Sequence, residues 1–351
     1  MSALTGVLFH AVGASSASLC YTPQKKTRAW SWQTYWLAQA LFCWLLLPVI
    51  GAWITIPHLG EVLSEAPPDA MYKSFLLGAA YGIGGTAFGV AIRFVGFSLT
   101  YAISVGISCV LGTLLPPLIH GQLADILSKA GSGWLVTGIA IGALGITMCG
   151  FAGRFKEKDL EKNKNNLAAF SLSKGLPLCF LAGVLSAVYG FALDQGQPIA
   201  DIAAKYGAGQ FQGNVIYLFA NTGAFLSTAI YCLYLHAKQK TFSEYKGISK
   251  ATGNRALSLN YVLALATGIL WYGQFFFYGL GHTRMGVYKF SSWAIHMIML
   301  VLFSTVVGLL FKEWKGVKKR TQWSLVLAVM ILILAVITLT YGNYLGMTLS
   351  T

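Results

Sequence analysis

The last long apolar stretch of the chain decides the fold class. It runs from Trp323 to Tyr344, reads WSLVLAVMILILAVITLTYGNY, and contains no charged residue. A helix rises about 1.5 Å per residue, so about 20 apolar residues are needed to cross the roughly 30 Å hydrocarbon core of a bilayer. The stretch meets that requirement, and it predicts a transmembrane helix.

Similar stretches occur along the whole sequence, and the composition agrees with them. Of the 351 residues, 56% are apolar or aromatic and only 10% are charged, whereas a soluble domain carries about 25% charged residues. We therefore expect an all-α integral membrane protein rather than a soluble one. Its ten transmembrane helices are expected over Leu4–Tyr21, Tyr35–Ile56, Lys73–Ile92, Gly96–Leu118, Trp134–Ala152, Gly175–Gln195, Phe211–Leu235, Ala256–Gly279, Val287–Phe311 and Trp323–Tyr344.

The basic residues indicate how these helices are oriented. When the connecting segments are assigned alternately to two sides, most of the 25 Lys and Arg fall on one side, and the other side holds only Lys73, Lys129, Lys205, Arg284 and Lys289. Loops rich in Lys and Arg face the cytoplasm. Both termini are therefore predicted to be periplasmic. The formal charge of +14 then describes how the chain lies in the lipid bilayer and gives no indication of nucleic acid binding.

A charged segment divides the spans into two sets of five. We expect an N-terminal five-helix repeat over 1–153, a cytoplasmic linker over 154–174 and a C-terminal five-helix repeat over 175–351. Because five is odd, two related halves must lie in opposite orientations, which is the inverted repeat of many secondary transporters. A faint internal similarity favours this, since Gly13-Ala-Ser-Ser-Ala in the first span resembles Gly183-Val-Leu-Ser-Ala in the sixth.

Glycines at spacings of three, four and seven form faces on two of the expected helices. They are Gly78, Gly82, Gly84, Gly85 and Gly89 in the third span and Gly138, Gly142 and Gly145 in the fifth. Small residues let membrane helices approach closely. Close packing is one interpretation, and smooth faces that let helices slide during transport are the other.

Ionisable residues at membrane depth are costly, so each is a functional candidate. Asp194 ends the sixth span, Lys289 begins the ninth, and His10 and His296 lie in the first and ninth. Asp194 and Lys289 could be an interfacial pair or a gate, and the histidines could be structural or could carry a proton near neutral pH. Glu313 is expected at the inner interface, beside basic neighbours.

The richest polar and aromatic stretch is WYGQFFFYGLGH, from Trp271 to His282. Helical spacing puts Trp271, Gln274 and Tyr278 on one face, and a face of the next span is expected to hold Lys289, Ser292, Trp293 and His296. Aromatic planes with amide, hydroxyl and imidazole groups suit a small polyol, although an aromatic belt at the membrane surface is the plain alternative. Further residues could complete such a site or form interhelical hydrogen bonds: Asn221, Ser15, Ser16, Ser186, Ser104 and Ser108.

No cofactor and no metal are expected. The six cysteines show no C-x-x-C spacing and no grouping with histidine, and the chain has no phosphate-binding loop, H-E-x-x-H or G-x-S-x-G motif. ATP-driven transport is therefore not indicated. A membrane enzyme would need paired acids, a metal or an activated nucleophile beside a large aqueous domain. An enzymatic function is therefore disfavoured.

Several motifs together resemble the L-rhamnose-proton symporter family of the drug/metabolite transporter superfamily. They are Gly13-Ala-Ser-Ser-Ala-Ser, Pro23-Gln-Lys-Lys, Trp30-Ser-Trp-Gln-Thr, the stretch Trp271 to His282, Ser292-Trp-Ala-Ile-His-Met and Lys312-Glu-Trp. The resemblance implies a bacterial inner-membrane protein that takes up a 6-deoxyhexose such as L-rhamnose with a proton as coupling ion, and a monomer is plausible. Asp194 and Lys289 depart from the family pattern.

Two alternatives within transport stay open. One is an exporter of drugs or metabolites, and the other is a symporter for a different monosaccharide, coupled to a proton or to another ion. Related sugars differ by one hydroxyl or methyl group, and one sequence does not show which of them a pocket rejects.

Overall fold

The chain folds into helices that belong to two compact units. The computed structural model describes residues 3–95, 97–161, 171–247 and 254–349, and no strand occurs in these ranges. Unit 1 comprises Met1–Ser18, Gly84–Phe191 and Leu280–Thr351, and unit 2 comprises Leu19–Ile83 and Ala192–Gly279. Each unit draws segments from both halves of the sequence.

The helices follow one another with short connections. The α-helices are α1 (Ala3–Leu19), α2 (Trp32–Ala40), α3 (Leu47–Thr55), α4 (Leu59–Glu65), α5 (Pro68–Val95), α6 (Phe97–Ile119), α7 (Leu123–Ser128), α8 (Ser132–Glu161), α9 (Leu172–Gln195), α10 (Gln197–Lys205), α11 (Ile216–Gln239), α12 (Asn254–His282), α13 (Ser291–Leu310) and α14 (Lys319–Leu349). Short 3-10 helices are η1 (Pro23–Lys26), η3 (Gly209–Val215), η4 (Phe242–Lys246) and η5 (Gly286–Tyr288), and η2 (Leu41–Leu46) is a π-helix.

The prediction of ten transmembrane helices is confirmed. Within the described ranges, ten helical segments are long and apolar enough to cross a membrane. Three shorter helices, α4, α7 and α10, lie between the apolar stretches and were not expected. Prolines mark two helix starts, because Pro68 opens α5 and Pro198 is the second residue of α10, and proline fits the first turn of a helix, where its missing N–H is not needed.

Two expectations about boundaries need correction. The predicted linker begins as helix, because α8 continues through Glu161. Its next part, 162–170, lies outside the described residues. The placement of Lys289 at the start of the ninth span is wrong, since α13 begins only at Ser291 and Lys289 is exposed after the short helix η5. A lysine in water avoids the cost of burial in hydrocarbon.

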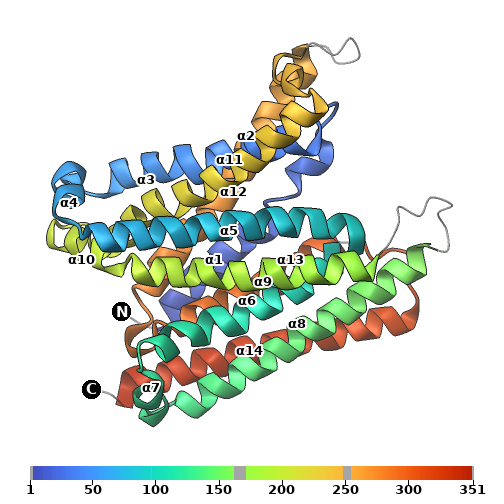
Figure 1. Ribbon diagram of the computed structural model, residues 1–351. Coiled ribbons are helices and arrows are strands. Elements are labelled where there is room, and N and C mark those ends of the chain that lie inside the picture. Colours follow the sequence, from blue (N-terminus) through green and yellow to red (C-terminus); the bar gives the residue numbers. More distant parts are fainter. Residues whose placement is uncertain (1–2, 96, 162–170, 248–253, 350–351) are drawn as a thin grey trace. The chain divides into compact units, whose positions relative to one another are not determined.

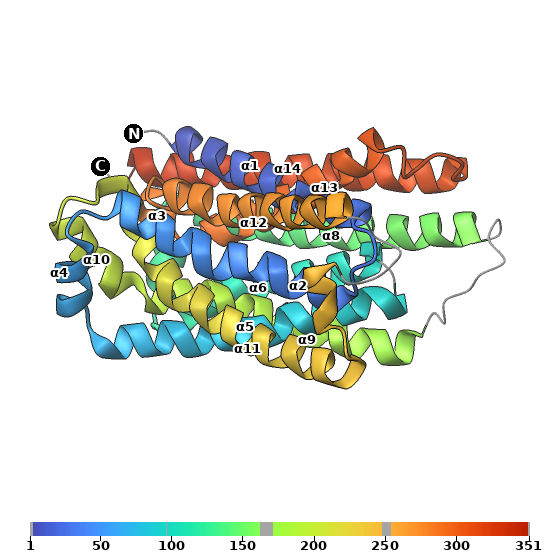
Figure 2. The ribbon, with the colours of Figure 1, turned by 90° about the horizontal axis from the view of Figure 1, so that it is seen from above.

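Unit 1 is held together by close contact between α8 and α14, which run antiparallel (Figure 1) and lie side by side when seen from above (Figure 2). A Cβ added to Gly138 or to Gly145 would lie only 2.7 Å from a side-chain atom of Leu339 or Leu332 on α14. The glycines of α8 therefore let a neighbouring helix approach closely, as expected for small residues in membrane helices.

Unit 2 uses glycine in the same way between α5 and α11. A Cβ on Gly78 would lie 2.8 Å from the Cα of Ala220, and a Cβ on Gly223 would lie 2.7 Å from the backbone nitrogen of Ala79. The two helices thus meet backbone to backbone. Side chains of ordinary size at these glycines would push α5 and α11 apart.

The π-helix η2 gives unit 2 its least regular backbone, and the sequence explains it. Pro48 follows one residue after Leu47 and cannot donate the hydrogen bond that an α-helix would make to the carbonyl of Trp44. The preceding turn opens, and the backbone N–H of Leu47 bonds to the carbonyl of Phe42 instead. Such π-turns inside α-helices occur frequently at functional sites.

Candidate functional site

The predicted aromatic residues of α12 lie in unit 2 and are buried. The exposed fractions of Trp271, Gln274 and Tyr278 are 3%, 5% and 7%, and Asn221 on α11 is fully buried. All three α12 residues lie on one continuous helix, as the spacing predicts. Because residues of an aromatic belt at the membrane surface would be partly exposed, their burial favours a site inside the protein.

Trp271 is part of a cluster of aromatic rings that we call the aromatic wall, formed by Trp44, Tyr81, Trp271 and Phe275. The ring of Trp271 lies 5.3 Å from that of Trp44 at 84°, 6.3 Å from that of Tyr81, and 4.8 Å from that of Phe275. Trp44 comes from η2 and Tyr81 from α5. Three segments distant in sequence therefore meet around one indole ring.

Sequence reasoning missed Trp44 and Tyr81. Both lie in stretches where aromatic residues are common and where neither stands out by spacing. Two signals could have found them: Pro48 predicts an irregular turn around Trp44, and Tyr81 lies between Gly78 and Gly82 in a helix that packs closely. Neither signal gives the contact with Trp271, which depends on the tertiary fold.

Two buried hydrogen-bond donors of unit 2, one of them in this wall, lack protein partners. Trp44 Nε1 and Tyr272 Oη are buried, and no other described residue bonds to them. A buried donor without a partner costs about 1–3 kcal/mol. The hydroxyl of Tyr272 occupies the space that a Cβ at Gly51 would fill, so glycine at that position makes room for it. Ligand hydroxyl groups would satisfy donors of this kind.

The predicted residues of α13 lie in unit 1, and their contacts differ from one another. The indole of Trp293 donates to the carbonyl of Ser108 at 2.9 Å, and its ring lies against Gly190. Trp293 thereby joins α13 to α6 and α9. The Ser292 hydroxyl is buried without a partner among the described residues.

Serines of α6 and α9 form interhelical hydrogen bonds. Ser108 donates to Ser186 at 3.0 Å, and Ser104 donates to the carbonyl of Cys179 at 3.0 Å. The interpretation of these serines as links between helices is confirmed. Inside a membrane such bonds are worth about 1 kcal/mol each.

The two predicted histidines contact each other in unit 1. The imidazoles of His10 on α1 and His296 on α13 are both fully buried, and their centroids lie 6.1 Å apart in an edge arrangement at 71°. His10 also lies within electrostatic range of His282, at the end of α12. A Cβ at Gly281 would lie 2.8 Å from Nε2 of His10, so a glycine in α12 admits this ring.

A pair of imidazoles at this distance can hold one proton, whereas a second proton is opposed by repulsion. At about 6 Å, two positive charges repel by several kcal/mol in a partly buried setting. The histidine pair, His10 and His296, can therefore alternate between neutral and singly charged forms. Of the other two candidates, Asp194 belongs to unit 2 and accepts a hydrogen bond from Gln195, whereas Lys289 belongs to unit 1.

A third buried histidine, His236 of unit 2, serves as a structural contrast. Its Nδ1 lies 2.7 Å from the hydroxyl of Thr241, and its Nε2 lies 3.0 Å from that of Tyr245. Because the Tyr245 hydroxyl donates to the carbonyl of Thr34, it accepts from Nε2–H of a neutral imidazole. Burial raises the pKa of Tyr245, so this hydroxyl keeps its proton at neutral pH.

The residues described here do not form a metal site. No three His, Cys, Asp or Glu side chains within the described ranges are arranged to hold an ion, and the six cysteines are free thiols. The aromatic wall with its donors and the histidine pair are the two sets of predicted residues on which a function can be built.

Comparison with known proteins adds the family. A family profile described as L-rhamnose-proton symport protein matches residues 1–347. An L-rhamnose-proton symporter of Mannheimia succiniciproducens is 34% identical over 322 residues, which cover 91% of this chain and 92% of the relative. Those of Cronobacter sakazakii and Pectobacterium atrosepticum are 34% and 32% identical, over 90% of this chain and 90% and 91% of their own lengths. The chain, with its ten apolar helices, is thus a multi-pass membrane protein that belongs to the L-rhamnose-proton symport family, whose members are transporters rather than enzymes.

Proposed function

We propose that this chain takes up L-rhamnose, or a closely similar 6-deoxyhexose, together with a proton across the bacterial inner membrane. Family membership supports the reaction class. The observation that carries the proposal is the presence of two buried sets of groups in one chain: an aromatic wall beside unsatisfied donors in unit 2, and paired imidazoles in unit 1. Sugar recognition and proton binding each need one of these sets.

The aromatic wall suits the sugar. The C–H faces of a pyranose ring pack on indole and phenol rings, while its hydroxyls accept hydrogen bonds from Trp44 Nε1 and Tyr272 Oη. The amide of Gln274 can both donate and accept hydrogen bonds. In this proposal Trp271, Gln274 and Tyr278 bind sugar together with Trp44, and Asn221 and Ser292 remain predicted sugar contacts.

The histidine pair suits the proton. Imidazole is a common proton carrier in proteins, and these two rings lie close enough to share one proton. In this proposal His10 and His296 share the transported proton. Trp293 holds α13 in place through its bond to Ser108, and Asp194 and Lys289 remain candidates for a gate.

We further propose that the two sequence halves are inverted repeats. Support comes from two pairs of matching glycine contacts. At Gly6 on α1, a Cβ would meet Met285 just after α12, and at Gly175 on α9 it would meet Val95 at the end of α5. These two contacts correspond to each other if α1 matches α9 and α12 matches α5.

The second pair of contacts lies in unit 2. Gly78 on α5 packs on α11, and Gly268 on α12 packs on η2, where its Cβ would lie 2.5 Å from that of Phe42. In an inverted repeat of five spans, the third span corresponds to the eighth and the second to the seventh. The packing of the third span on the seventh then has its counterpart in the packing of the eighth on the second.

The orientation of the chain remains a proposal that rests on its basic loops, with the termini periplasmic. Cysteine labelling tests it, because Ser128 and Lys318 are both exposed and lie in loops predicted to be on opposite sides. In intact spheroplasts, a membrane-impermeant maleimide should label S128C but not K318C. The reverse pattern would overturn the orientation.

Transport in proteoliposomes tests the function. L-Rhamnose added outside should enter and should carry protons with it, which alkalinises the external medium. L-Mannose, which carries a hydroxyl where L-rhamnose has only hydrogen on C6, should be transported about 10- to 100-fold less efficiently, the range that one such group contributes. Rhamnose entry without proton movement would contradict coupling, and absence of rhamnose entry would contradict the proposal.

A further inference from the structure

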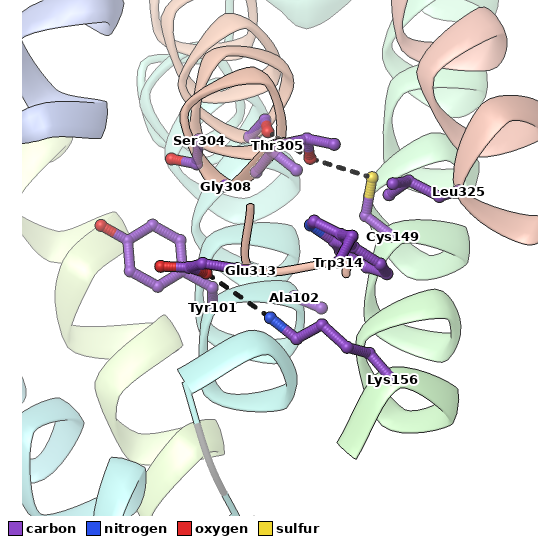
Figure 3. Close-up of a pocket in the computed structure, with 11 residues that line it drawn as sticks. Tyr101, Ala102, Cys149, Lys156, Ser304, Thr305, Gly308, Glu313, Trp314 and Leu325 are labelled. Carbon is purple, nitrogen blue, oxygen red and sulfur yellow. Dashed lines mark hydrogen bonds and ion pairs between the residues drawn. The ribbon is translucent and has the colours of Figure 1, made fainter. Parts of the chain in front are cut away.

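Unit 1 contains a small polar cavity that is separate from the histidine pair. It lies near the C-terminal ends of α8 and α13 and has a volume of about 70 Å³. Its lining includes Lys156, Ser304, Thr305, Glu313 and Trp314, and Figure 3 shows Lys156 and Glu313 facing each other across it. The helices that surround it are α6, α8, α13 and α14.

The volume indicates what the cavity can hold. A buried water needs about 10–15 Å³, and a cavity that binds benzene has a volume of about 150 Å³. The cavity therefore excludes a sugar but accommodates several waters. The buried hydroxyl of Ser304 has no partner among the described residues, and water in the cavity would supply one.

Glu313 reaches this cavity because of how α13 ends. The backbone N–H of Glu313 bonds to the carbonyl of Gly308 at 2.9 Å, and that of Lys312 bonds to the carbonyl of Leu309 at 3.0 Å. Lys312 has a positive φ of 57°, so the chain reverses at this point in the manner of a Schellman motif. The reversal folds Glu313 back, and a Cβ at Gly308 would lie 3.5 Å from its Oε2.

The charges around the carboxylate favour its ionised form. Lys156 Nζ lies 3.5 Å from Glu313 Oε2, and the same ammonium lies 4.8 Å from the centre of the Trp314 ring. The other titratable groups of the lining are the Tyr101 hydroxyl of α6 and the Cys149 thiol of α8. Cys149 is paired with the Thr305 hydroxyl at 3.8 Å. Lys156 is therefore a cation that favours the ionised form of the Glu313 carboxylate.

We propose that this cavity is a hydrated exit for the transported proton and that Glu313 is the group that releases it to the cytoplasm. The inference rests on the proposed proton symport and on the proposed orientation. A hydronium ion in the cavity gives its proton to the Glu313 carboxylate and becomes water. The carboxylic acid then gives the proton to water on the cytoplasmic side, and Lys156 again pairs with the carboxylate.

The position of Glu313 suits this role. Its side chain is 34% exposed, whereas that of Lys156 is 14% exposed, so the acid has access both to the cavity and to water outside. His296 and Ser304 lie on the same helix, eight residues apart, which is about 12 Å along the axis. The buried Leu300 lies between them. The histidine pair and the cavity are therefore two separate polar sites, with apolar packing between them.

Two modes of transport in proteoliposomes separate proton release from sugar binding. Net uptake requires the proton to leave on the inside, whereas exchange of internal for external L-rhamnose does not. We expect E313Q to reduce net uptake and its proton flux by about 100-fold, the lower range for a positioned proton-transfer group. Exchange by E313Q should stay within about twofold of the unaltered protein, since sugar binding is not changed.

A matched control comes from the same end of unit 1. Asp159 is an acid whose carboxylate accepts hydrogen bonds from the backbone of Lys318 and from Thr321, and it does not line the cavity. D159N should retain both net uptake and exchange. Net uptake by E313Q equal to that by D159N would overturn the proposal, and so would loss of exchange together with net uptake, because release is not needed for exchange.

Lys156 gives a second test with a pH readout. Without the ammonium, the Glu313 carboxylate binds its proton more tightly, so K156Q should be inhibited by luminal acid at a higher pH than the unaltered protein. An unchanged pH profile of net uptake would contradict the role of Lys156. This variant keeps the acid and therefore tests the ion pair rather than the presence of Glu313.

Infrared spectroscopy tests Glu313 without sugar transport. A pH-induced difference spectrum of the purified protein should contain a protonated carboxyl band that disappears in E313Q and persists in D159N. Absence of such a band would overturn the proposed role of Glu313 in proton release, even if rhamnose symport is intact. Failure of the unaltered protein to transport rhamnose, with the band present, would contradict the proposed symport while leaving Glu313 as a titrating group in a hydrated cavity.

Discussion

The aromatic wall of unit 2 and the histidine pair of unit 1 differ in the chemistry that they offer. The wall consists of neutral rings with donors that keep their protons, so its binding strength depends on ring contact and hydrogen bonds. The pair consists of two imidazoles, each of which carries a charge only when it binds a proton. Sugar affinity and proton coupling are therefore expected to respond to different substitutions, and the predictions below separate them.

The largest expected effect is the loss of coupling when the histidine pair is broken. H10Q and H296Q each remove a proton-binding ring but keep a polar side chain of similar length. Rhamnose-driven proton flux should fall by about 100-fold or more, as when a positioned proton-transfer group is lost. Equilibrium binding of L-rhamnose, measured by calorimetry, should change by less than about threefold. An equally large loss of affinity for L-rhamnose would mean that the histidine pair belongs to the sugar site.

A smaller effect is expected at the aromatic wall, in affinity rather than in coupling. W271A removes ring contact worth about 1–2 kcal/mol, so the Kd for L-rhamnose should rise by about 5- to 30-fold. W44F keeps a ring but removes the unsatisfied N–H, and about fivefold weaker binding is expected from the loss of one hydrogen bond. W53F is the control, because Trp53 is 75% exposed. Equal effects of W44F and W53F would contradict the proposed bond to Trp44.

His236 sharpens the comparison because it is a buried histidine bonded through both nitrogens. H236Q should leave the ratio of protons to sugar unchanged. It should lower the free energy of unfolding by about 1–2 kcal/mol, since Thr241 or Tyr245 loses a partner. Thermal unfolding followed by tryptophan fluorescence measures this. A changed ratio of protons to sugar in H236Q would show that residues of unit 2 also take part in proton coupling.

The smallest effect is expected at Lys312, which adopts a backbone conformation that favours glycine. K312G should keep the turn that positions Glu313 and should change the stability by less than about 1 kcal/mol, because relief of strain offsets the added flexibility of the unfolded chain. Net uptake should be retained. Loss of net uptake in K312G would show that the lysine charge, rather than the turn, matters at this position.

The extent of sequence prediction differed between fold and site. Helix number followed from apolar length, because a membrane helix must satisfy its backbone within one segment of about 20 residues. The burial of Trp271 and Gln274 followed from helical spacing. The sequence indicates His10 and His296 only as two separate candidates. Their contact depends on how α1 packs against α13.

Other features could not be read from the sequence, for physical reasons. The role of Trp44 depends on a π-helix before Pro48 and on the approach of α12 through Gly268. The position of Glu313 depends on the left-handed backbone conformation of Lys312, a position where glycine would be the usual residue. Lys289 looked like part of a helix because its neighbours are apolar, although the helix begins after it. Tertiary packing decides each of these.

The central claim is that proton binding resides in the histidine pair and sugar binding in the aromatic wall. Simultaneous measurement of proton and L-rhamnose entry into proteoliposomes, for the unaltered protein, H296Q and W271A, tests it most directly. The account predicts a fixed ratio of protons to sugar in the unaltered protein and in W271A at saturating sugar, and a ratio near zero for the L-rhamnose that enters through H296Q. An unchanged ratio in H296Q, or a ratio altered by W271A, would contradict it.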